Sequence, residues 1–195
     1  MSTAIVILAA GSSSRMGKPK QLLDFNGQTL LNIVIRESLK TKFRPVVVVL
    51  GAYAAEIKQA STNQEVIYSF NEDWENGMSS SISFGLKVAL ENNPKIENVI
   101  LTVADQVHIS SDIFEELQSK QEQSKKNIVA SAYSQTTGTP TLFNKKYFDN
   151  LLVLSGSNGA KSLIKQYVDD TTTIPFELGN IDIDTETDYN NLINN

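Results

Sequence analysis

Short apolar runs rich in Val and Ile alternate along this chain with stretches whose apolar residues recur at helical spacing. Residues 5–8 are apolar at every position, which is typical of a central parallel strand buried on both faces. Residues 29–39 carry apolar side chains on one face, as expected for a helix packed on a sheet. Further strands are predicted at 46–50, 66–69, 99–103 and 129–132, and further helices at 54–60, 82–90, 110–121 and 160–168.

This alternation predicts a single α/β domain over residues 1–195, folded as a three-layer α/β/α sandwich around a mostly parallel sheet. A chain of 195 residues with 41% hydrophobic content is long enough to bury a core without disulfides. We expect residues 141–143 to form a short extended piece. Residues 180–193 are expected to pass from a strand into a helix.

Charge and cysteine content narrow the range of partners. The formal net charge is −5 and no broad basic face is evident, so nucleic-acid binding is not expected. Cysteine is absent, which excludes disulfides and thiol catalysis and fits a reducing compartment. No apolar run approaches the roughly 20 residues of a membrane span. We therefore expect a cytoplasmic protein that binds neither nucleic acid nor membrane.

The first predicted strand runs directly into a loop rich in glycine, serine and basic residues. Ligands of open α/β sheets bind beyond the carboxyl ends of strands, so this loop is a candidate site. It is not a P-loop, because Pro19 stands where Ser or Thr is needed, and Ser13 replaces the second glycine of a dinucleotide motif. Small residues such as Gly11 admit a phosphate, which Arg15 and Lys20 can bind. The alternative is a flexible loop with solvated basic residues.

Two acidic stretches can supply a metal site. Asp105 ends the strand predicted at 99–103, and Mg²⁺ prefers one or two carboxylates together with phosphate oxygens. Asp182 and Asp184 are two residues apart, so on a strand they would face the same side. The alternative is that these aspartates only cap turns and helices. The single histidine, His108, is expected to be structural.

A run of serines precedes the helix predicted at 82–90. Ser79, Ser80 and Ser81 stand where N-caps are expected, and donors at a helix N-terminus form a site for an anion or hydroxyl group. Trp74, the only tryptophan, is expected to be a packing residue.

The string "LAAGSSSRMGKPKQLL" closely resembles the signature L-A-A/G-G-x-S-x-R-M-G-x-x-K of the nucleotidyltransferases of molybdenum cofactor biosynthesis. The residues in register with it are Gly11, Ser13, Arg15, Met16, Gly17 and Lys20. "ADQ", "NEDWENGMSSSI", "GTPTLF" and "DIDTETDY" resemble further motifs of that family, so the resemblance covers nearly the whole chain. L-A-A-G, with Ala10, resembles the cytidylyltransferase branch.

The sequence also departs from the family pattern. Val107 replaces a proline after "ADQ", and Glu186 stands where proline is common in the tail motif. In "SGSNGAKSL", Ser157 replaces an expected aspartate and Lys161 stands where arginine is common. The loss of that carboxylate leaves the identity of the acceptor open. Lys18 lies outside the fixed pattern and is expected to be solvated.

The resemblance implies a Rossmann-like nucleotidyltransferase fold, with residues of about 1–106 binding the nucleotide and the remainder binding the acceptor. It implies Mg²⁺-dependent transfer of CMP from CTP to the phosphate of molybdopterin, with release of pyrophosphate. Implied catalytic residues are Arg15, Lys20 and Asp105, and implied metal ligands are Asp105 and Asp184. Implied nucleotide-binding residues are Leu8, Ala9, Ala10, Gly11, Ser13, Arg15, Lys20, Ser79, Ser80 and Ser81.

Two alternatives stay open. The acceptor can be a sugar or alcohol phosphate, because the "SGSNGAKSL" loop departs from the family. The protein can also be a non-catalytic carrier that passes the finished cofactor to a molybdoenzyme. The intact Arg15, Lys20 and Asp105 argue against a carrier, because a carrier does not need residues that bind a metal and a triphosphate.

Overall fold

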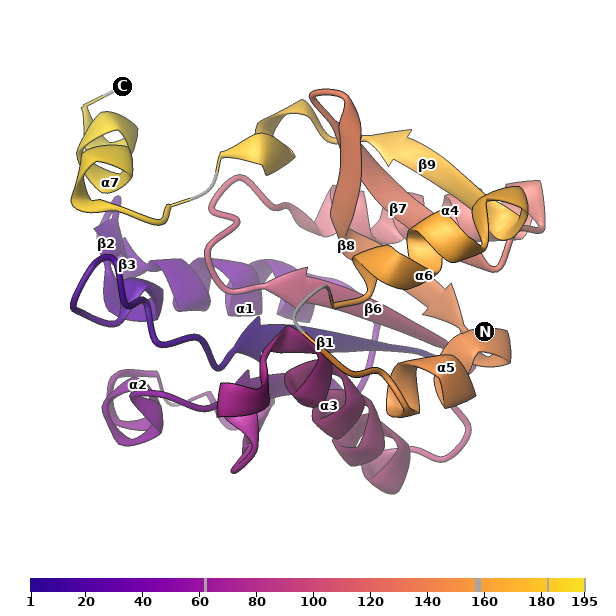
Figure 1. The fold of residues 1–195 in the computed structure, drawn as a ribbon, viewed down its shortest axis with the longest axis horizontal. Coiled ribbons are helices and arrows are strands. Elements are labelled where there is room, and N and C mark those ends of the chain that lie inside the picture. Colours follow the sequence, from indigo (N-terminus) through magenta and orange to yellow (C-terminus); the bar gives the residue numbers. More distant parts are fainter. Residues whose placement is uncertain (62, 157–158, 182, 195) are drawn as a thin grey trace.

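The computed structural model describes residues 1–61, 63–156, 159–181 and 183–194. Within these residues seven strands form one sheet in the order β5-β4-β1-β6-β8-β7-β9, with helices on both faces (Figure 1). The predicted three-layer sandwich is therefore confirmed. The strands are β1 (Thr3–Ala9), β4 (Val46–Leu50), β5 (Ile67–Phe70), β6 (Asn98–Val103), β7 (Ile128–Tyr133), β8 (Thr136–Asn144) and β9 (Thr171–Pro175). A separate two-stranded ribbon pairs β2 (Asp24–Phe25) with β3 (Gln28–Thr29).

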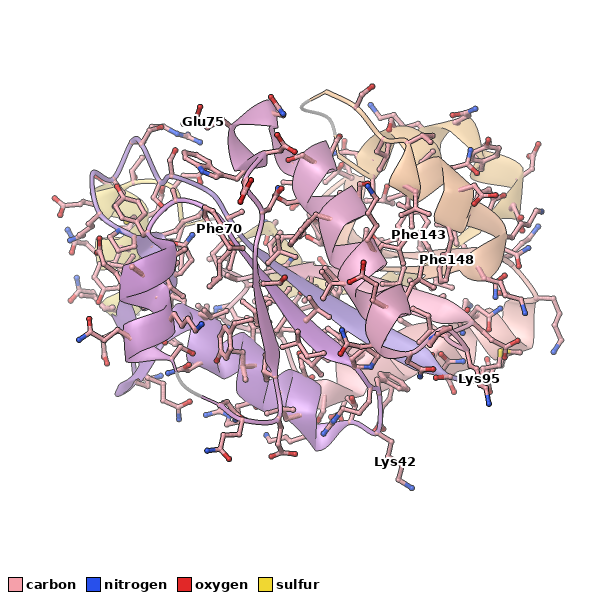
Figure 2. The ribbon with its side chains drawn as sticks, turned by 90° about the horizontal axis from the view of Figure 1, so that it is seen from below. Lys42, Phe70, Glu75, Lys95, Phe143 and Phe148 are labelled. Atoms are coloured by element: carbon pink, nitrogen blue, oxygen red, sulfur yellow. The ribbon has the colours of Figure 1, made fainter. Side chains whose placement is uncertain are left out.

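All the described helices except the last divide between the two faces of the sheet, and the last packs beside the loop that follows β1. They are α1 (Leu30–Lys40), α2 (Ala54–Ala60), α3 (Met78–Asn92), α4 (Ser111–Ser124), α5 (Phe148–Leu152), α6 (Lys161–Gln166) and α7 (Glu186–Ile193). Alternate side chains of β1 pack on opposite faces, as the pleat requires. Val6 and its neighbours contact α3, α5 and α6, whereas Ile7 and its neighbours contact α1, α2 and α4. In Figure 2, Phe143 and Phe148 lie beside α3, while Lys42 extends away from the protein.

Strand β8 is longer than the short piece predicted at 141–143, and it runs antiparallel between β6 and β7. The register shifts between Ala130 and Ser131, which leaves Thr139 and Pro140 in a bulge. A bulge accommodates a proline because its missing N–H is not needed in the ladder. Glycine at Gly138 leaves room for the Tyr133 hydroxyl. The bulge explains why the sequence predicted an extended piece only at 141–143 and not over the whole of β8.

At the end of the chain one strand was not predicted, and one predicted strand is not found among the described residues. Strand β9 pairs parallel with β7 at the sheet edge, but its threonine-rich sequence lacks the apolar run of a central strand. The described residues of the tail, Ile181, Ile183 and Asp184, belong to no strand. Ile183 instead packs with Met16 and Val107 in a small apolar cluster, so the tail covers the first loop rather than extending the sheet.

In the described residues, no helix combines the length and apolar character that a membrane crossing requires.

Candidate active site

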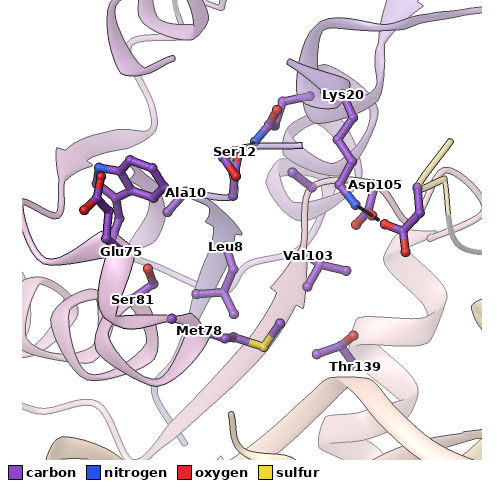
Figure 3. A pocket seen from close by; sticks show the side chains of 16 residues that line it. Leu8, Ala10, Ser12, Lys20, Glu75, Met78, Ser81, Val103, Asp105 and Thr139 are labelled. Carbon is purple, nitrogen blue, oxygen red and sulfur yellow. Dashed lines mark hydrogen bonds and ion pairs between the residues drawn. The ribbon is translucent and has the colours of Figure 1, made fainter. Parts of the chain in front are cut away.

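A cavity of about 540 Å³ lies at the carboxyl ends of β1 and β6, where ligands bind in open α/β sheets. Figure 3 shows Lys20 and Asp105 on one side, Glu75 on the other, and Leu8 and Val103 between them. The predicted site residues that line this cavity are Leu8, Ala10, Gly11, Lys20, Ser81, Asp105 and Asp184. The predicted residues outside its lining are Ala9, Ser13, Arg15, Ser79 and Ser80.

The basic loop after β1 is folded by its own signature residues. The N–H groups of Met16 and Gly17 donate to the carbonyl of Ser13 at 2.8 and 3.1 Å. Ser13 and Gly17 both have positive φ, at 49° and 68°, and glycine adopts this conformation without strain. The Ser13 hydroxyl accepts a hydrogen bond from the backbone N–H of Lys20 at 3.2 Å. Ser13 and Gly17 therefore shape the loop that carries Arg15 and Lys20.

Lys20 is the centre of the charged side of the cavity. Its Nζ lies 2.6 Å from Asp105 Oδ2 and 3.0 Å from Asp184 Oδ1, and its side chain is 21% exposed. Burial alone would lower the pKa of Lys20, but the adjacent Asp105 and Asp184 carboxylates outweigh burial and raise the pKa. Lys20 is therefore a fixed cation at neutral pH.

Arg15 completes this group of charges from the solvent side. Its guanidinium donates to Asp184 Oδ2 at 2.7 Å, although the Arg15 side chain is 68% exposed. Partial burial opposes ionisation of Asp184, but Lys20 and Arg15 together lower its pKa. Arg15, Lys20, Asp105 and Asp184 form what we call the Lys20 cluster, in which both cations have acidic partners before any phosphate is bound.

The tail after Ile183 holds the loop by ion pairs as well as by packing. Lys18, expected to be solvated, instead donates to Glu186 at 2.9 Å. α7 begins at Glu186 behind a capping box between Thr185 and Asp188, which fixes the position of the Glu186 backbone. The sequence did not indicate this pair, because its members are far apart along the chain.

The Asp105–Asp184 pair suits a magnesium ion that arrives with a triphosphate. Mg²⁺ takes one or two protein carboxylates and completes its coordination with phosphate oxygens and water. Among the residues that the structure describes, no group of three or more His, Cys, Asp or Glu side chains could hold a metal ion alone. Asp182, the predicted partner of Asp184, lies outside the described residues, as does Ser157.

The serine run occupies the first turn of α3 rather than its N-cap. α3 begins at Met78, and Gly77 is its N-cap, with φ 93°. The Ser80 hydroxyl donates to the carbonyls of Asp73 and Gly77 at 2.8 and 2.9 Å. Ser79 is buried, and its hydroxyl has no hydrogen-bond partner among the described residues. Of the three serines, Ser81 alone lines the cavity.

Several lining residues were not predicted from the sequence. Trp74 packs against the core, as expected, and it also lines the cavity. Gly51 is glycine because a Cβ there would lie 2.6 Å from that of Trp74. Glu75 and Gln21 also line the cavity, and both sit inside recognised motif stretches. Their positions within the motif stretches "NEDWENGM" and "GKPKQLL" were the sequence signal from which they could have been predicted as site residues.

A second cavity of about 210 Å³ adjoins the first. The residues shared by both linings are Leu8, Met78, Val103 and Thr139. The additional lining comes mainly from β8 and α6 and includes Tyr133, Thr137 and Lys161. The Lys161 ammonium donates to the Thr136 hydroxyl at 2.8 Å. Two molecules bound in these cavities would therefore meet over the ends of β1 and β6.

The family model of the MobA-like NTP transferase domain matches residues 5–171 of the chain. The chain belongs to the MobA-like NTP transferase family. The predicted family and fold are both confirmed, and they place this protein among nucleotidyltransferases.

Three relatives with different names show how broad this MobA-like family is. The chain is 33% identical to nicotine blue oxidoreductase of Paenarthrobacter nicotinovorans over 106 residues, which are 54% of this chain and 50% of that one. It is 27% identical to purine catabolism protein PucB of Bacillus subtilis over 171 residues, covering 82% and 79%. It is 28% identical to molybdenum cofactor cytidylyltransferase of Escherichia coli over 113 residues, covering 57% and 56%. The chain thus spans about half the length of the first of these relatives.

Solved structures of mycobacterial proteins share the fold. A homologue of Rv0371c from Mycobacterium sp. strain JC1 superposes with a TM-score of 0.86 at 27% identity, covering 98% of this chain and 95% of that one. Rv0371c of Mycobacterium tuberculosis, in complex with manganese, superposes with a TM-score of 0.81 at 23% identity, covering 100% and 99%.

Proposed function

We propose that this MobA-like protein transfers CMP from CTP to the terminal phosphate of molybdopterin and releases pyrophosphate. The observation that carries the proposal is the position of Lys20, whose Nζ lies between Asp105 and Asp184 at the edge of the 540 Å³ cavity. A cation and two carboxylates at the end of β1 can bind a metal–triphosphate. Ala10 favours CTP through its likeness to the cytidylyltransferase branch.

The reaction needs alignment and charge neutralisation more than proton transfer. An oxygen of the acceptor phosphate attacks the α-phosphorus, and the bond to the oxygen that bridges to the β-phosphorus breaks. The acceptor phosphate is already ionised at neutral pH, so no side chain has to remove a proton. Lys20 and Arg15 bind phosphate oxygens and stabilise the charge that develops on them. Mg²⁺ held by Asp105 and Asp184 would neutralise further phosphate charge.

Nucleotide binding exchanges the partners of Lys20 and Arg15. In the ligand-free protein both cations are paired with Asp184, and Lys20 also with Asp105. A triphosphate brings oxygens that replace these carboxylates as partners of the cations, which frees Asp105 and Asp184 for Mg²⁺. The cation site is therefore completed by the nucleotide and is weak without it.

The acceptor occupies the second cavity. This placement follows the proposed division of the chain, in which residues of about 1–106 bind the nucleotide and the remainder binds the acceptor. Thr139 and Met78 belong to both cavities, so an acceptor there would present its phosphate to the α-phosphorus. The Lys161 side chain at the rim offers a cation to the acceptor.

The test is pyrophosphate release from CTP, GTP and ATP with Mg²⁺, in the presence of molybdopterin. We expect release with CTP and its loss in Asp105→Asn, while the matched variant Asp149→Asn, at an exposed position in α5, keeps full turnover. Unchanged turnover in Asp105→Asn would contradict the mechanism. Binding of the pterin without pyrophosphate release from any triphosphate would indicate a carrier instead.

A second acceptor class is favoured by the second cavity itself. Its described lining contains no Asp or Glu, although a carboxylate is a natural partner for the amino group of a pterin. Hydroxyl groups of Tyr133 and Thr137 and the ammonium of Lys161 suit a small sugar or alcohol phosphate. Turnover of such a phosphate with no turnover of molybdopterin would favour this acceptor.

A further inference from the structure

Gln21 lies directly beneath the basic loop and is 2% exposed. Its Nε2 donates to the carbonyl of Ala9 and to the carbonyl of Gly11, both at 3.0 Å. Only the NH₂ end of the amide can donate to two carbonyls, so these partners fix its orientation. Gln21 Oε1 is buried and has no hydrogen-bond partner among the described residues. The side chain thus acts on the loop solely through its two N–H groups.

These two bonds determine where the loop directs its own N–H groups. The peptide bonds of the loop are trans, since the cis bonds of the described chain are Arg44–Pro45 and Thr139–Pro140. In a trans peptide the C=O and the following N–H point in opposite directions. Holding the Ala9 and Gly11 carbonyls on the Gln21 side therefore turns the N–H groups of Ala10 and Ser12 to the other side.

The remaining carbonyl of this stretch is fixed as well. The Ala10 carbonyl accepts a hydrogen bond from the N–H of Ala52 at 3.1 Å. In the described part of the chain, no backbone hydrogen bond outside the regular elements has the N–H of Ala10, Gly11 or Ser12 as its donor. Ala10, Gly11 and Ser12 all line the 540 Å³ cavity. The carbonyls of Ala9, Ala10 and Gly11 are thus held by donors of the protein, while the N–H groups of Ala10 to Ser12 have no such acceptor among the described residues.

We propose that Gln21 is a positioning residue, which orients the N–H groups of Ala10 and Ser12 toward the oxygens of the bound nucleotide. The inference rests on the proposed function, because the ligand is the nucleoside triphosphate assigned to this cavity. Neighbouring backbone N–H groups that converge on one point bind an anion strongly when the loop is held in place before binding. Gln21 does so through the loop, by holding the carbonyls of Ala9 and Gly11.

The test compares Gln21→Met with Gln121→Met. Methionine keeps the length and burial of Gln21 but has no donor. Gln121 is a matched control, because it is 5% exposed, also has a buried Oε1 without a described partner, and lies in α4 outside the cavity lining. We expect Gln21→Met to raise the Kd of Mg–CTP by at least tenfold and the KM for CTP in parallel, without changing the KM for the acceptor. Gln121→Met leaves all three constants at the wild-type values.

A crystal structure of ligand-free Gln21→Met provides a readout that does not depend on activity. We expect the Ala9 and Gly11 carbonyls to rotate away from their wild-type directions. If the two carbonyls keep their wild-type directions in Gln21→Met and the variant binds Mg–CTP with the wild-type Kd, the inference is overturned. The proposed function still stands in that case. If the wild-type protein binds none of CTP, GTP and ATP, the proposed function fails, and the carbonyl directions still decide the role of Gln21. Should Gln21→Met not fold, Gln21→Glu, which places a carboxylate against both carbonyls, tests the same point.

Discussion

Two charged clusters at opposite ends of the sheet are each centred on a side chain of equal exposure but differ in what they can do. The side chains of Lys20 and Asp170 are each 21% exposed. Lys20 belongs to the cluster with Arg15, Asp105 and Asp184 at the carboxyl ends of β1 and β6. Asp170 directly precedes β9 and bonds Asn127, which directly precedes β7, so its cluster lies at the amino ends of parallel strands.

The Asp170 cluster, which comprises Asp170, Asn127, Lys146 and Tyr147, is saturated by the protein. Asp170 accepts hydrogen bonds from Lys146 Nζ at 2.7 Å, Tyr147 Oη at 2.8 Å, and the Asn127 backbone and side chain at 3.1 and 3.0 Å. Burial opposes ionisation of Asp170, yet these donors hold its pKa well below the usual range. Burial and the Asp170 charge raise the pKa of Tyr147.

The Lys20 cluster has the opposite arrangement. One ammonium is shared by two carboxylates from distant segments, and all three groups line a cavity. Its members can change partners when phosphates and a cation enter, whereas Asp170, Asn127, Lys146 and Tyr147 line neither of the two cavities described above. A carboxylate whose oxygens are saturated by protein donors, such as that of Asp170, indicates a structural ion pair. An ammonium that two carboxylates share beside a cavity, such as that of Lys20, indicates a binding site.

The largest expected difference between the Lys20 cluster and the Asp170 cluster is in how their substitutions affect turnover. Asp105→Asn is expected to lower kcat/KM for pyrophosphate release by about 10²–10³-fold, the usual loss when a group that stabilises developing charge is removed. The same change at Asp170 should leave kcat/KM within about twofold at 25 °C, because that cluster is remote from the cavity. A matching loss in Asp170→Asn would break the comparison.

The second effect is on stability, where the substitution of Asp170 is expected to have a larger effect than the substitution of Asp105. Asp170→Ala leaves Tyr147 and Asn127 without their acceptor, so we expect about 2–4 kcal/mol less free energy of unfolding in urea. Asp105→Ala leaves Lys20 paired with Asp184, so no cation is left without a partner, and we expect a smaller loss than in Asp170→Ala.

The acid dependence of the Asp170 cluster follows from the same contacts. The folded pKa of Asp170 is lowered, so its contribution is complete above the unfolded carboxyl value and is lost as the pH falls below roughly 4. Asp170→Asn should unfold with a flatter pH profile in that range. Equal acid profiles for the variant and the wild type would contradict this assignment.

A further prediction concerns metal affinity. Lys20→Met removes the cation that Asp105 and Asp184 share, so the variant should bind Mn²⁺ without nucleotide at least about tenfold more tightly than the wild type, a modest share of the repulsion between close charges. Electron paramagnetic resonance of free Mn²⁺ measures this directly. The wild type should match the variant only when CTP is present. If both proteins bind Mn²⁺ equally without CTP, the proposed exchange of partners is wrong.

The smallest effect is expected at His108, three residues after Asp105. Its ring packs edge-on against Phe25 with centroids 6.2 Å apart, and burial lowers its pKa. A lowered pKa means that the unfolded chain binds the proton more readily, so stability falls as the pH drops below about 6.5, by less than about 1 kcal/mol. His108→Gln should remove this dependence while leaving the steeper loss near pH 4. Thermal unfolding between pH 5 and pH 8 measures it.

Local sequence patterns predicted most of the sheet. The runs at 46–50 and 99–103 are apolar because their strands are buried on both faces, and both were found as expected. Strand β9 and the first half of β8 were not predicted, because a threonine-rich edge and a bulge around Pro140 carry no apolar period. Their strand character comes from pairing with β7, which only the assembled sheet provides.

The amino-acid sequence by itself determined most of the strands and helices and the basic loop with Arg15 and Lys20. It also carried the resemblance to the family to which the chain belongs. The tertiary structure decided which acid meets which base. Asp184 reaches Lys20 across 164 residues because Ile183 packs beside Met16 and places the tail over the loop. Such a contact depends on where a distant segment docks, and no local periodicity records it. The same holds for Gln21, whose role appears only once the carbonyls of Ala9 and Gly11 are in place above it.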